Sequence, residues 1–368
     1  MQPAPYTRSD FHHSPMVVFY ETTRACDLVC RHCRASAQPR RDPRELTSEQ
    51  SAQLIAQIAS FPKPPMLVFT GGDPLKRGDA YDQVRRAVEL GLEAAMTPSA
   101  TPLVTPEALQ RLKDAGLHRL AVSLDGADPP THDALRGVPG SFDRTLAIMA
   151  GARRVGLPLQ VNTTITRNNV HQVDTLAAML AGRGIVLWSV FFLVPVGRGE
   201  QLPRISPQQY EEVFEKLWYH AGRQPYGIKT TEAPHYRRFV LQRRGNPQRQ
   251  PGAAPGAQDQ RAPLGINDGK GIVFIDHRGA IYPSGFLPLC CGRFPRDSVV
   301  EVYQNSLLFC RLRDPNQLRG KCGRCEFRHV CGGSRARSYA LSGDMLAPEP
   351  DCTYQPALSK DRQPTTSN

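Results

Sequence analysis

The chain has 368 residues, of which 22% are charged, and a formal net charge of +12 at pH 7. A chain of this length can bury one large core or two domains. No apolar run is long enough to cross a membrane, and the first residues lack the basic and apolar segments of a secretory signal. We therefore expect a cytoplasmic protein without a membrane partner, whose ten cysteines are metal ligands or free thiols rather than disulfides.

The positive charge admits an anionic ligand, an acidic protein or nucleic acid as a partner. The chain has no zinc-finger spacing and no concentrated run of Lys and Arg with interleaved aromatic residues. We therefore expect no nucleic-acid partner. An arginine-rich surface that binds nothing in particular explains the charge equally well.

Short apolar segments alternate with longer amphipathic segments over the first two thirds of the chain. The expected strands are 16–21, 66–70, 94–97, 119–124, 159–165 and 186–194. The expected helices are 47–60, 81–90, 106–115, 142–155 and 170–182. Six strands separated by helices predict an α/β fold with a parallel sheet, and the length suits a partial (β/α)6 barrel. The pattern also allows a further strand at 227–231 and a helix at 234–243.

The chain changes character after this alternation. Residues 244–263 are rich in Pro, Gly and Gln and lack apolar periodicity, which predicts a flexible linker. Residues 271–282 then have the pattern of a hairpin that turns at 276–279. A cysteine-rich region follows.

Three closely spaced cysteines follow the first expected strand. Cys26, Cys30 and Cys33 have the spacing C-x3-C-x2-C. Three thiolates on one short loop can hold three irons of a [4Fe–4S] cluster, which leaves the fourth iron free to bind a small molecule. A zinc site is the alternative, but zinc usually needs four ligands, and a histidine such as His32 would have to supply the fourth.

The second expected strand ends in Gly71-Gly72-Asp73-Pro74. In parallel β/α folds, functional residues collect at the C-terminal ends of the strands. The two glycines allow a close backbone approach, and Asp73 offers acceptors to an ammonium group. A simple turn with a helix-capping Asp is the alternative.

Taken together, these two motifs resemble the signature of the radical S-adenosylmethionine (SAM) superfamily, over about residues 16–196. The resemblance implies that Cys26, Cys30 and Cys33 hold a [4Fe–4S] cluster whose open iron chelates the amino and carboxylate groups of SAM. It also implies the family's reaction. Reductive cleavage of SAM gives methionine and a 5′-deoxyadenosyl radical, which abstracts a hydrogen atom from the substrate.

The resemblance further implies which residues contact SAM. They are Gly71, Gly72, Asp73, Ser123, Arg136, Asn162 and Val194. Asp73 stands where most members have Glu, and Arg136 can pair with the SAM carboxylate through its planar guanidinium. Asp125 would organise the loop after the fourth strand, and His32 would pack beside the cluster. Local turn or core chemistry is the alternative for each of these residues.

A second cysteine set lies near the C-terminus, at Cys322, Cys325, Cys331 and Cys352. Four thiolates can close a structural zinc site or hold an iron–sulfur cluster, and the spacing alone does not choose between them. Downstream of a radical SAM core, this region resembles the SPASM extension. That resemblance implies an auxiliary [4Fe–4S] cluster.

The chain departs from the full SPASM pattern, which has seven cysteines and two clusters. Arg335 and Ser284 stand where two of those cysteines are expected. We therefore predict one auxiliary cluster. Cys290 and Cys291 could serve another, but adjacent cysteines ligate poorly together, and Cys310 is expected in the core.

These patterns predict the following division of the chain. The ranges are a disordered N-terminus at 1–14, a radical SAM core at 15–243, a flexible linker at 244–264, a SPASM-like auxiliary cluster domain at 265–355, and a disordered tail at 356–368.

Radical SAM chemistry does not specify the substrate. Two chemistries of relatives fit, namely oxidative decarboxylation of tetrapyrrole propionates, as in haem synthesis, and modification of a ribosomally made peptide. The segment 281–289 and the overall size look similar to the tetrapyrrole branch, and the positive charge suits an anionic substrate. A non-enzymatic iron–sulfur electron carrier is a third alternative, although it would not need the motifs around SAM.

The end of the last barrel unit is the candidate substrate rim. Glu232, His235, Arg237 and Arg238 offer an acid, an imidazole and two guanidinium groups there, and we expect them to act in catalysis on an anionic small molecule or a peptide. A capped helix start with a solvated basic face is the alternative. A flavodoxin or ferredoxin is the expected reductant.

Overall fold

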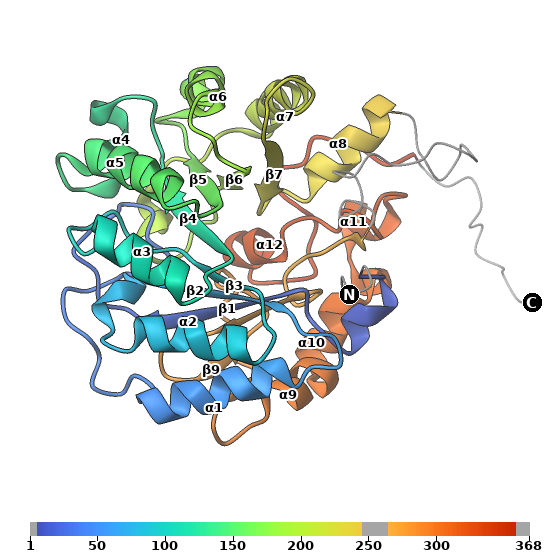
Figure 1. Cartoon of the computed structure of the whole chain (residues 1–368). Helices are drawn as coiled ribbons and strands as arrows, with labels where there is room; N and C mark the ends of the chain where they lie inside the picture. The colour runs from blue at the N-terminus through green and yellow to red at the C-terminus, as the bar shows by residue number, and fades with distance from the viewer. Residues whose placement is uncertain (1–5, 245–263, 358–368) are drawn as a thin grey trace, which may run out of the picture.

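The structure is a computed structural model that describes residues 6–244 and 264–357. Its centre is one curved sheet of ten strands, in the order β10-β9-β8-β1-β2-β3-β4-β5-β6-β7 (Figure 1). The first seven strands run parallel to their neighbours. They are β1 (Val17–Thr23), β2 (Met66–Gly71), β3 (Ala94–Met96), β4 (Arg119–Ser123), β5 (Leu159–Ile165), β6 (Leu187–Phe192) and β7 (Gly227–Thr231). The predicted α/β fold with a parallel sheet is confirmed, and the additional strand at 227–231 is present.

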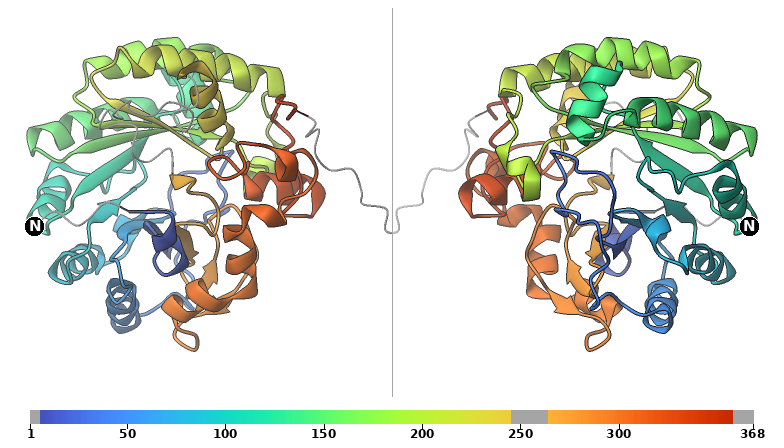
Figure 2. Two further views of the ribbon diagram at one scale, coloured as in Figure 1. Left: turned by 90° about the vertical axis from the view of Figure 1, so that its right-hand side faces the viewer. Right: turned by 90° about the vertical axis from the view of Figure 1, so that its left-hand side faces the viewer.

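Helices cover the outer face of this sheet (Figure 2). They are α1 (Ser48–Ala59), α2 (Ala80–Glu89), α3 (Pro106–Asp114), α4 (Pro129–Arg136), α5 (Ser141–Arg154), α6 (Val173–Ala181), α7 (Pro207–Ala221) and α8 (His235–Arg244). Helices α4 and α7 were not among the expected helices, although Ser206 and Gln209 form a capping box that starts α7. None of the described helices combines the length and apolarity needed to cross a bilayer.

The core lies between the sheet and these helices. Alternate strand residues such as Leu67 and Phe69 are fully buried against apolar helix residues such as Leu54 and Ile58. This packing follows from the helical period, which places the apolar residues of α1 on one face. The polar ends of the strands are thereby left at one rim of the sheet.

The C-terminal segment continues the same sheet. The predicted hairpin is present as β8 (Ile272–Ile275) and β9 (Ala280–Tyr282), and β8 also pairs in parallel with β1. Strand β10 (Gly292–Arg293) completes the edge. Side chains of the hairpin such as Val273 and Ile281 belong to the same hydrophobic core as the barrel helices. The segment therefore packs as an extension of the barrel and covers its open side (Figure 2).

Short helices follow the hairpin. They are α9 (Val299–Asn305), α10 (Leu307–Arg313), α11 (Gly320–Arg324) and α12 (Arg335–Ser342). Helix α9 packs against α1 of the barrel, and α12 lies in the middle of the view in Figure 1, near the ends of the central strands. The last four cysteines thus flank a helix that faces the barrel.

The N-terminal segment differs from its prediction. Residues 1–14 were expected to be disordered, but Ser9–His12 form a 3-10 helix and Phe11 is 1% exposed. The Phe11 ring packs over Gly271, and its carbonyl accepts from the Tyr303 hydroxyl at 2.7 Å. Burial of one aromatic ring fixes a segment that is otherwise polar. The predicted linker at 244–264 and the predicted disordered tail at 356–368 lie outside the described residues except at residues 244, 264, 356 and 357.

Candidate functional site

The N-terminal cysteine loop follows β1 and borders a cavity of about 1110 Å³, including its mouth, at the C-terminal ends of the strands. Cys26, Cys30 and Cys33 all line this cavity. Backbone N–H groups point at two of the sulfurs, from Leu28 to Cys26 Sγ at 3.4 Å and from Ala37 to Cys33 Sγ at 3.4 Å. Such N–H groups favour thiolates, whereas burial raises the pKa of the Cys26 and Cys30 thiols.

Gly71, the last residue of β2, and the next residue, Gly72, allow the cysteine loop to lie against that strand. Gly71 has φ +142°, and a Cβ there would come within 2.2 Å of the Thr23 carbonyl oxygen. A Cβ on Gly72 would lie 2.3 Å from the Ala25 carbonyl oxygen. Any larger residue would push the loop away. Both glycines line the cavity.

Asp73 is not among the residues that line the cavity. Its side chain is fully buried and accepts from the Thr101 hydroxyl at 2.6 Å and from the Leu75 N–H at 3.2 Å. Burial raises the pKa of this carboxyl group. In this structure Asp73 therefore caps the short turn after β2, which is the alternative that the sequence left open.

Arg136 lines the cavity in an ion pair with a buried acid. Its Nη2 lies 2.6 Å from Asp125 Oδ2, and its Nη1 lies 3.7 Å from Cys30 Sγ. Burial alone would raise the pKa of Asp125, but Arg136 and the Thr164 N–H hold it below its usual value. His32 lies 3.5 Å from the same carboxylate, and burial lowers its pKa to about 4. Asp125 thus organises the loop, as expected, and holds Arg136 beside the cysteines.

The other predicted SAM contacts also reach the cavity. Ser123, Asn162 and Val194 line it from β4, from β5 and from the residues after β6. They lie together because parallel strands end at one rim.

Several cavity residues escaped the sequence analysis. Ser99, Phe191, Arg198 and Phe286 also line the cavity. Ser99 follows β3, and its hydroxyl donates to the Gly72 carbonyl at 2.8 Å and lies 3.2 Å from Cys26 Sγ. Its position directly after an expected strand is the sequence feature that could have identified it as a cavity residue. Phe286 comes from the C-terminal segment and packs against Phe191 with ring centroids 6.5 Å apart, a contact that no local pattern reveals.

Arg198 fixes the back of the cysteine loop. Its Nε donates to the Cys30 carbonyl at 2.8 Å, and its Nη1 donates to the Ala37 carbonyl at 3.0 Å. The preceding Gly197 has φ +56°, and a Cβ there would lie 2.5 Å from the Arg34 carbonyl oxygen. The segment after β6 therefore also holds the cysteine loop in place.

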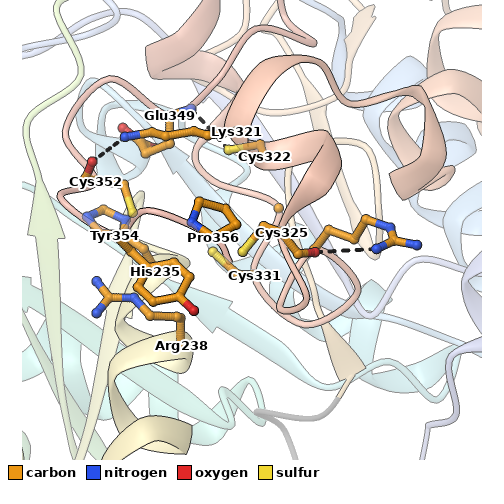
Figure 3. A pocket seen from close by; sticks show the side chains of 12 residues that line it. His235, Arg238, Lys321, Cys322, Cys325, Cys331, Glu349, Cys352, Tyr354 and Pro356 are labelled. Carbon is orange, nitrogen blue, oxygen red and sulfur yellow. Dashed lines mark hydrogen bonds between the residues drawn. The ribbon is translucent and has the colours of Figure 1, made fainter. Parts of the chain in front are cut away.

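The C-terminal cysteines converge as predicted, although they come from separate segments. Cys322, Cys325, Cys331 and Cys352 line one pocket of about 380 Å³, including its mouth (Figure 3). The Glu349 N–H donates to Cys322 Sγ at 3.2 Å, and the Gly333 N–H donates to Cys331 Sγ at 3.4 Å. Burial raises the pKa of Cys325 to about 11 and raises the pKa of Cys331 further. Four half-buried cysteines around one space, two of them with N–H donors to their sulfurs, offer the thiolates that a metal group needs.

Two buried arginines on α12 build the scaffold of this pocket. Arg335, which stands where a cysteine was expected, donates to the carbonyls of Met345 and Ala347 at 3.0 and 2.7 Å. Arg337 is fully buried and pairs with Glu349 at 3.2 Å and Asp351 at 3.2 Å. Arginine at both positions therefore orders the segment that carries the last cysteine.

Arg337 also connects this scaffold to the barrel. It donates to the Glu232 carbonyl at 2.6 Å, and weaker contacts reach the carbonyls of Phe192 and Leu193 at 3.4 and 3.5 Å. Phe192 and Leu193 line the first cavity. One guanidinium group thus joins the two cysteine sites.

The expected substrate rim is not brought to the cavity. Glu232 accepts from the Ser334 hydroxyl at 2.5 Å, and Arg237 donates to the Val330 carbonyl at 3.0 Å. Arg238 pairs with Glu211 and is 5% exposed, while His235 is fully buried. His235 and Arg238 instead line the C-terminal cysteine pocket. The prediction treated the start of α8 as an open rim, but the C-terminal segment packs over it.

The remaining cysteines stay outside both sites. Cys290 and Cys310 are exposed and Cys291 is half-buried, so the expectation that Cys310 belongs to the core is wrong. Cys310 lies on the exposed face of α10, with its sulfur 3.3 Å from an Arg313 nitrogen.

Ser284, which stands where another cysteine was expected, stabilises a turn. Its hydroxyl accepts from the Phe286 N–H at 3.2 Å, in the turn that carries Phe286.

Known proteins are similar to this chain in sequence and in fold. The Radical SAM superfamily matches residues 20–180. The "AdoMet-dependent heme synthase" of Methanosarcina barkeri is 36% identical over 94% of this chain and 98% of its own length. The protein of the same name from Nitratidesulfovibrio vulgaris is 38% identical over 96% of each chain. Streptococcus suis SuiB bound to S-adenosylmethionine covers 93% of this chain and 78% of its own, with a TM-score of 0.73 and 15% identity.

Proposed function

Because the chain belongs to the radical SAM superfamily, whose members are enzymes that use SAM and a [4Fe–4S] cluster, we propose that it synthesises haem. In this proposal it converts propionate side chains of a haem precursor into vinyl groups by oxidative decarboxylation. The observation that carries the proposal is the similarity to two haem synthases along nearly the whole length of all three chains. The matched length therefore extends beyond the SAM motif into the C-terminal segment.

The reaction requires a hydrogen atom and an electron to leave the substrate. When bound at Cys26, Cys30 and Cys33, the cluster supplies the electron that cleaves SAM to methionine and the 5′-deoxyadenosyl radical. The propionate carbon next to the ring would give a hydrogen atom to that radical, with 5′-deoxyadenosine as the by-product. The substrate radical then loses carbon dioxide and one electron, which leaves the vinyl double bond.

The residues that line the cavity are compatible with binding SAM and a tetrapyrrole. Ser123, Asn162 and Val194 surround the space for SAM. Arg136 keeps a positive charge near Cys30, where the SAM carboxylate would approach the open iron. Phe191 and Phe286 offer apolar faces at the same cavity, and a flat macrocycle can stack on such faces.

The departing electron needs an acceptor. We propose that Cys322, Cys325, Cys331 and Cys352 hold one auxiliary [4Fe–4S] cluster that supplies it. The four half-buried cysteines around one pocket and the N–H donors to two of their sulfurs support this assignment. A flavodoxin or ferredoxin would provide the first electron, in the cytoplasm.

Anaerobic turnover tests the proposal. The reconstituted protein is incubated with SAM, dithionite and iron coproporphyrin III, and the products are followed by mass spectrometry. We expect 5′-deoxyadenosine together with a tetrapyrrole that has lost carbon dioxide and two hydrogens for each vinyl group formed. The variant Cys26→Ala is the control and should give neither product.

Two results would contradict this function. If 5′-deoxyadenosine forms while the tetrapyrrole stays unchanged, the substrate is of another class, and a ribosomally made peptide is the next to test. If metal analysis finds about four irons and one zinc in each chain, the C-terminal cysteines hold zinc and cannot accept the electron.

A further inference from the structure

His235 lies on the wall of the C-terminal cysteine pocket without a hydrogen-bond partner. It begins α8, is 0% exposed, and neither Nδ1 nor Nε2 has a partner in the structure. Leaving a buried polar group unpaired is unfavourable, because the group has lost its hydrogen bonds to water. A group that binds in the pocket can remove this cost.

The surroundings of the ring restrict where a partner can come from. Two aromatic rings of α7 flank it, with centroids 5.1 Å away at Tyr210 and 4.9 Å away at Phe214. Aromatic faces are weak acceptors, so these contacts fix the ring by packing rather than by hydrogen bonding. His235 also lines the pocket that the four cysteines line (Figure 3). The pocket is therefore the place for its acceptor.

The other hydrogen-bonding side chains around the pocket already have partners. Their contacts are Arg238 with Glu211, Lys321 with the Cys352 carbonyl, Arg328 with the Cys325 carbonyl, Tyr354 with Glu326, and Glu349 with Arg337. Among the described lining residues with a polar group other than a thiol, His235 alone has no partner for any side-chain nitrogen or oxygen. His235 differs in this respect from Arg238, which also lies on α8 and lines the pocket but is paired with Glu211.

We propose that His235 donates a hydrogen bond to a sulfur atom of the iron–sulfur cluster at Cys322, Cys325, Cys331 and Cys352, and so raises the reduction potential of that cluster. The inference rests on the proposed function, because it needs the auxiliary cluster. A neutral imidazole carries one N–H. A hydrogen bond to sulfur stabilises the added negative charge of the reduced cluster more than it stabilises the oxidised cluster. His235 is thus a positioning and tuning residue that does not touch the substrate.

A redox titration of the full-length protein tests this role. The reduced clusters are followed by electron paramagnetic resonance (EPR), and added SAM identifies the signal of the cluster that binds it. His235→Phe keeps an aromatic ring for Tyr210 and Phe214 but lacks the N–H. We expect the equilibrium to shift about tenfold against the reduced auxiliary cluster, or ~59 mV for a one-electron couple. His235→Gln retains an N–H donor and should stay nearer to the unchanged protein.

Controls separate tuning from general disturbance. His220→Phe replaces another buried histidine, which pairs with Asp174 on α6, and should leave the potential unchanged. Equal potentials in the unchanged protein and His235→Phe would overturn the inference. So would pulsed EPR of the unchanged protein that shows nitrogen bound directly to iron, a measurement that stands even if His235→Phe fails to fold. If the unchanged protein lacks the second cluster, the proposed function fails instead, and iron analysis reports this separately.

Discussion

The two cysteine sites of this protein are built in different ways. Cys26, Cys30 and Cys33 lie on one loop, and backbone contacts at Gly71, Gly72 and Gly197 fix its position. The C-terminal cysteines come from segments up to thirty positions apart (352 − 322 = 30), and buried charged side chains hold those segments together. The first site depends on close packing of backbone, whereas the second depends on paired charges. The two should therefore respond to different substitutions.

The largest difference between the two sites is expected in SAM cleavage, when Cys30→Ala is compared with Cys325→Ala. Cys30→Ala removes a ligand from the loop in the SAM cavity, so SAM cleavage should fall below detection. Cys325→Ala should remove about half of the iron and stop substrate turnover, while uncoupled formation of 5′-deoxyadenosine continues. Iron analysis and chromatography of 5′-deoxyadenosine measure both effects. Loss of SAM cleavage in Cys325→Ala would show that the two sites are not separable.

The charged scaffold of the second site is tested by Arg337→Leu. This change leaves Glu349 without its buried guanidinium partner, while Asp351 keeps Arg204 at 2.6 Å. Removing one member of a buried ion pair costs about 3–5 kcal/mol. Urea unfolding measures the change in the free energy of unfolding. The matched control, Arg324→Leu on an exposed position of α11, should stay within about 0.5 kcal/mol, and an equal loss in both variants would refute this role.

The backbone packing of the first site is tested by Gly197→Ala. Its Cβ would meet carbonyl oxygens of Arg34 and Cys33 at 2.5 and 2.7 Å, so the cysteine loop must shift. Gly140→Ala is the matched control, because φ is +76° there but nothing lies within 4 Å of a new Cβ. Both variants should lose about 1–2 kcal/mol through backbone strain. Only Gly197→Ala should also release iron faster to a chelator, and equal release rates would contradict the contact.

The smallest effect is expected for Asp73→Ala. The residue caps a turn, so its loss should cost about 1 kcal/mol of stability and change the affinity for SAM little. Calorimetric titration of SAM into the reconstituted protein measures the affinity. A tenfold to hundredfold loss of affinity with intact iron, the effect of about 1.5–3 kcal/mol from a charge-assisted hydrogen bond, would instead place Asp73 at the SAM ammonium group.

Much of the first site could be predicted from the sequence, because its residues follow directly after predicted strands or lie on one short loop. The order of strands and helices placed Ser123, Asn162 and Val194 at one rim, and all three line the cavity. The same reasoning failed for Arg237 and Arg238. The C-terminal ends of β1 to β6 border the cavity, as the rule for parallel strands predicts. The end of β7 is instead covered by the C-terminal segment. No local sequence pattern indicates which distant segment packs there.

The sequence by itself determined the parallel α/β architecture, the cysteine loop and the convergence of the strand ends, because periodicity and spacing act over a few residues. The tertiary structure alone decided three further points. It joined the C-terminal hairpin to β1 and brought Phe286 to the cavity at the strand ends. It also turned His235 from an expected rim residue into a buried neighbour of the last four cysteines. Each of these outcomes depends on burial of apolar surface between segments far apart in the chain, which local sequence does not encode.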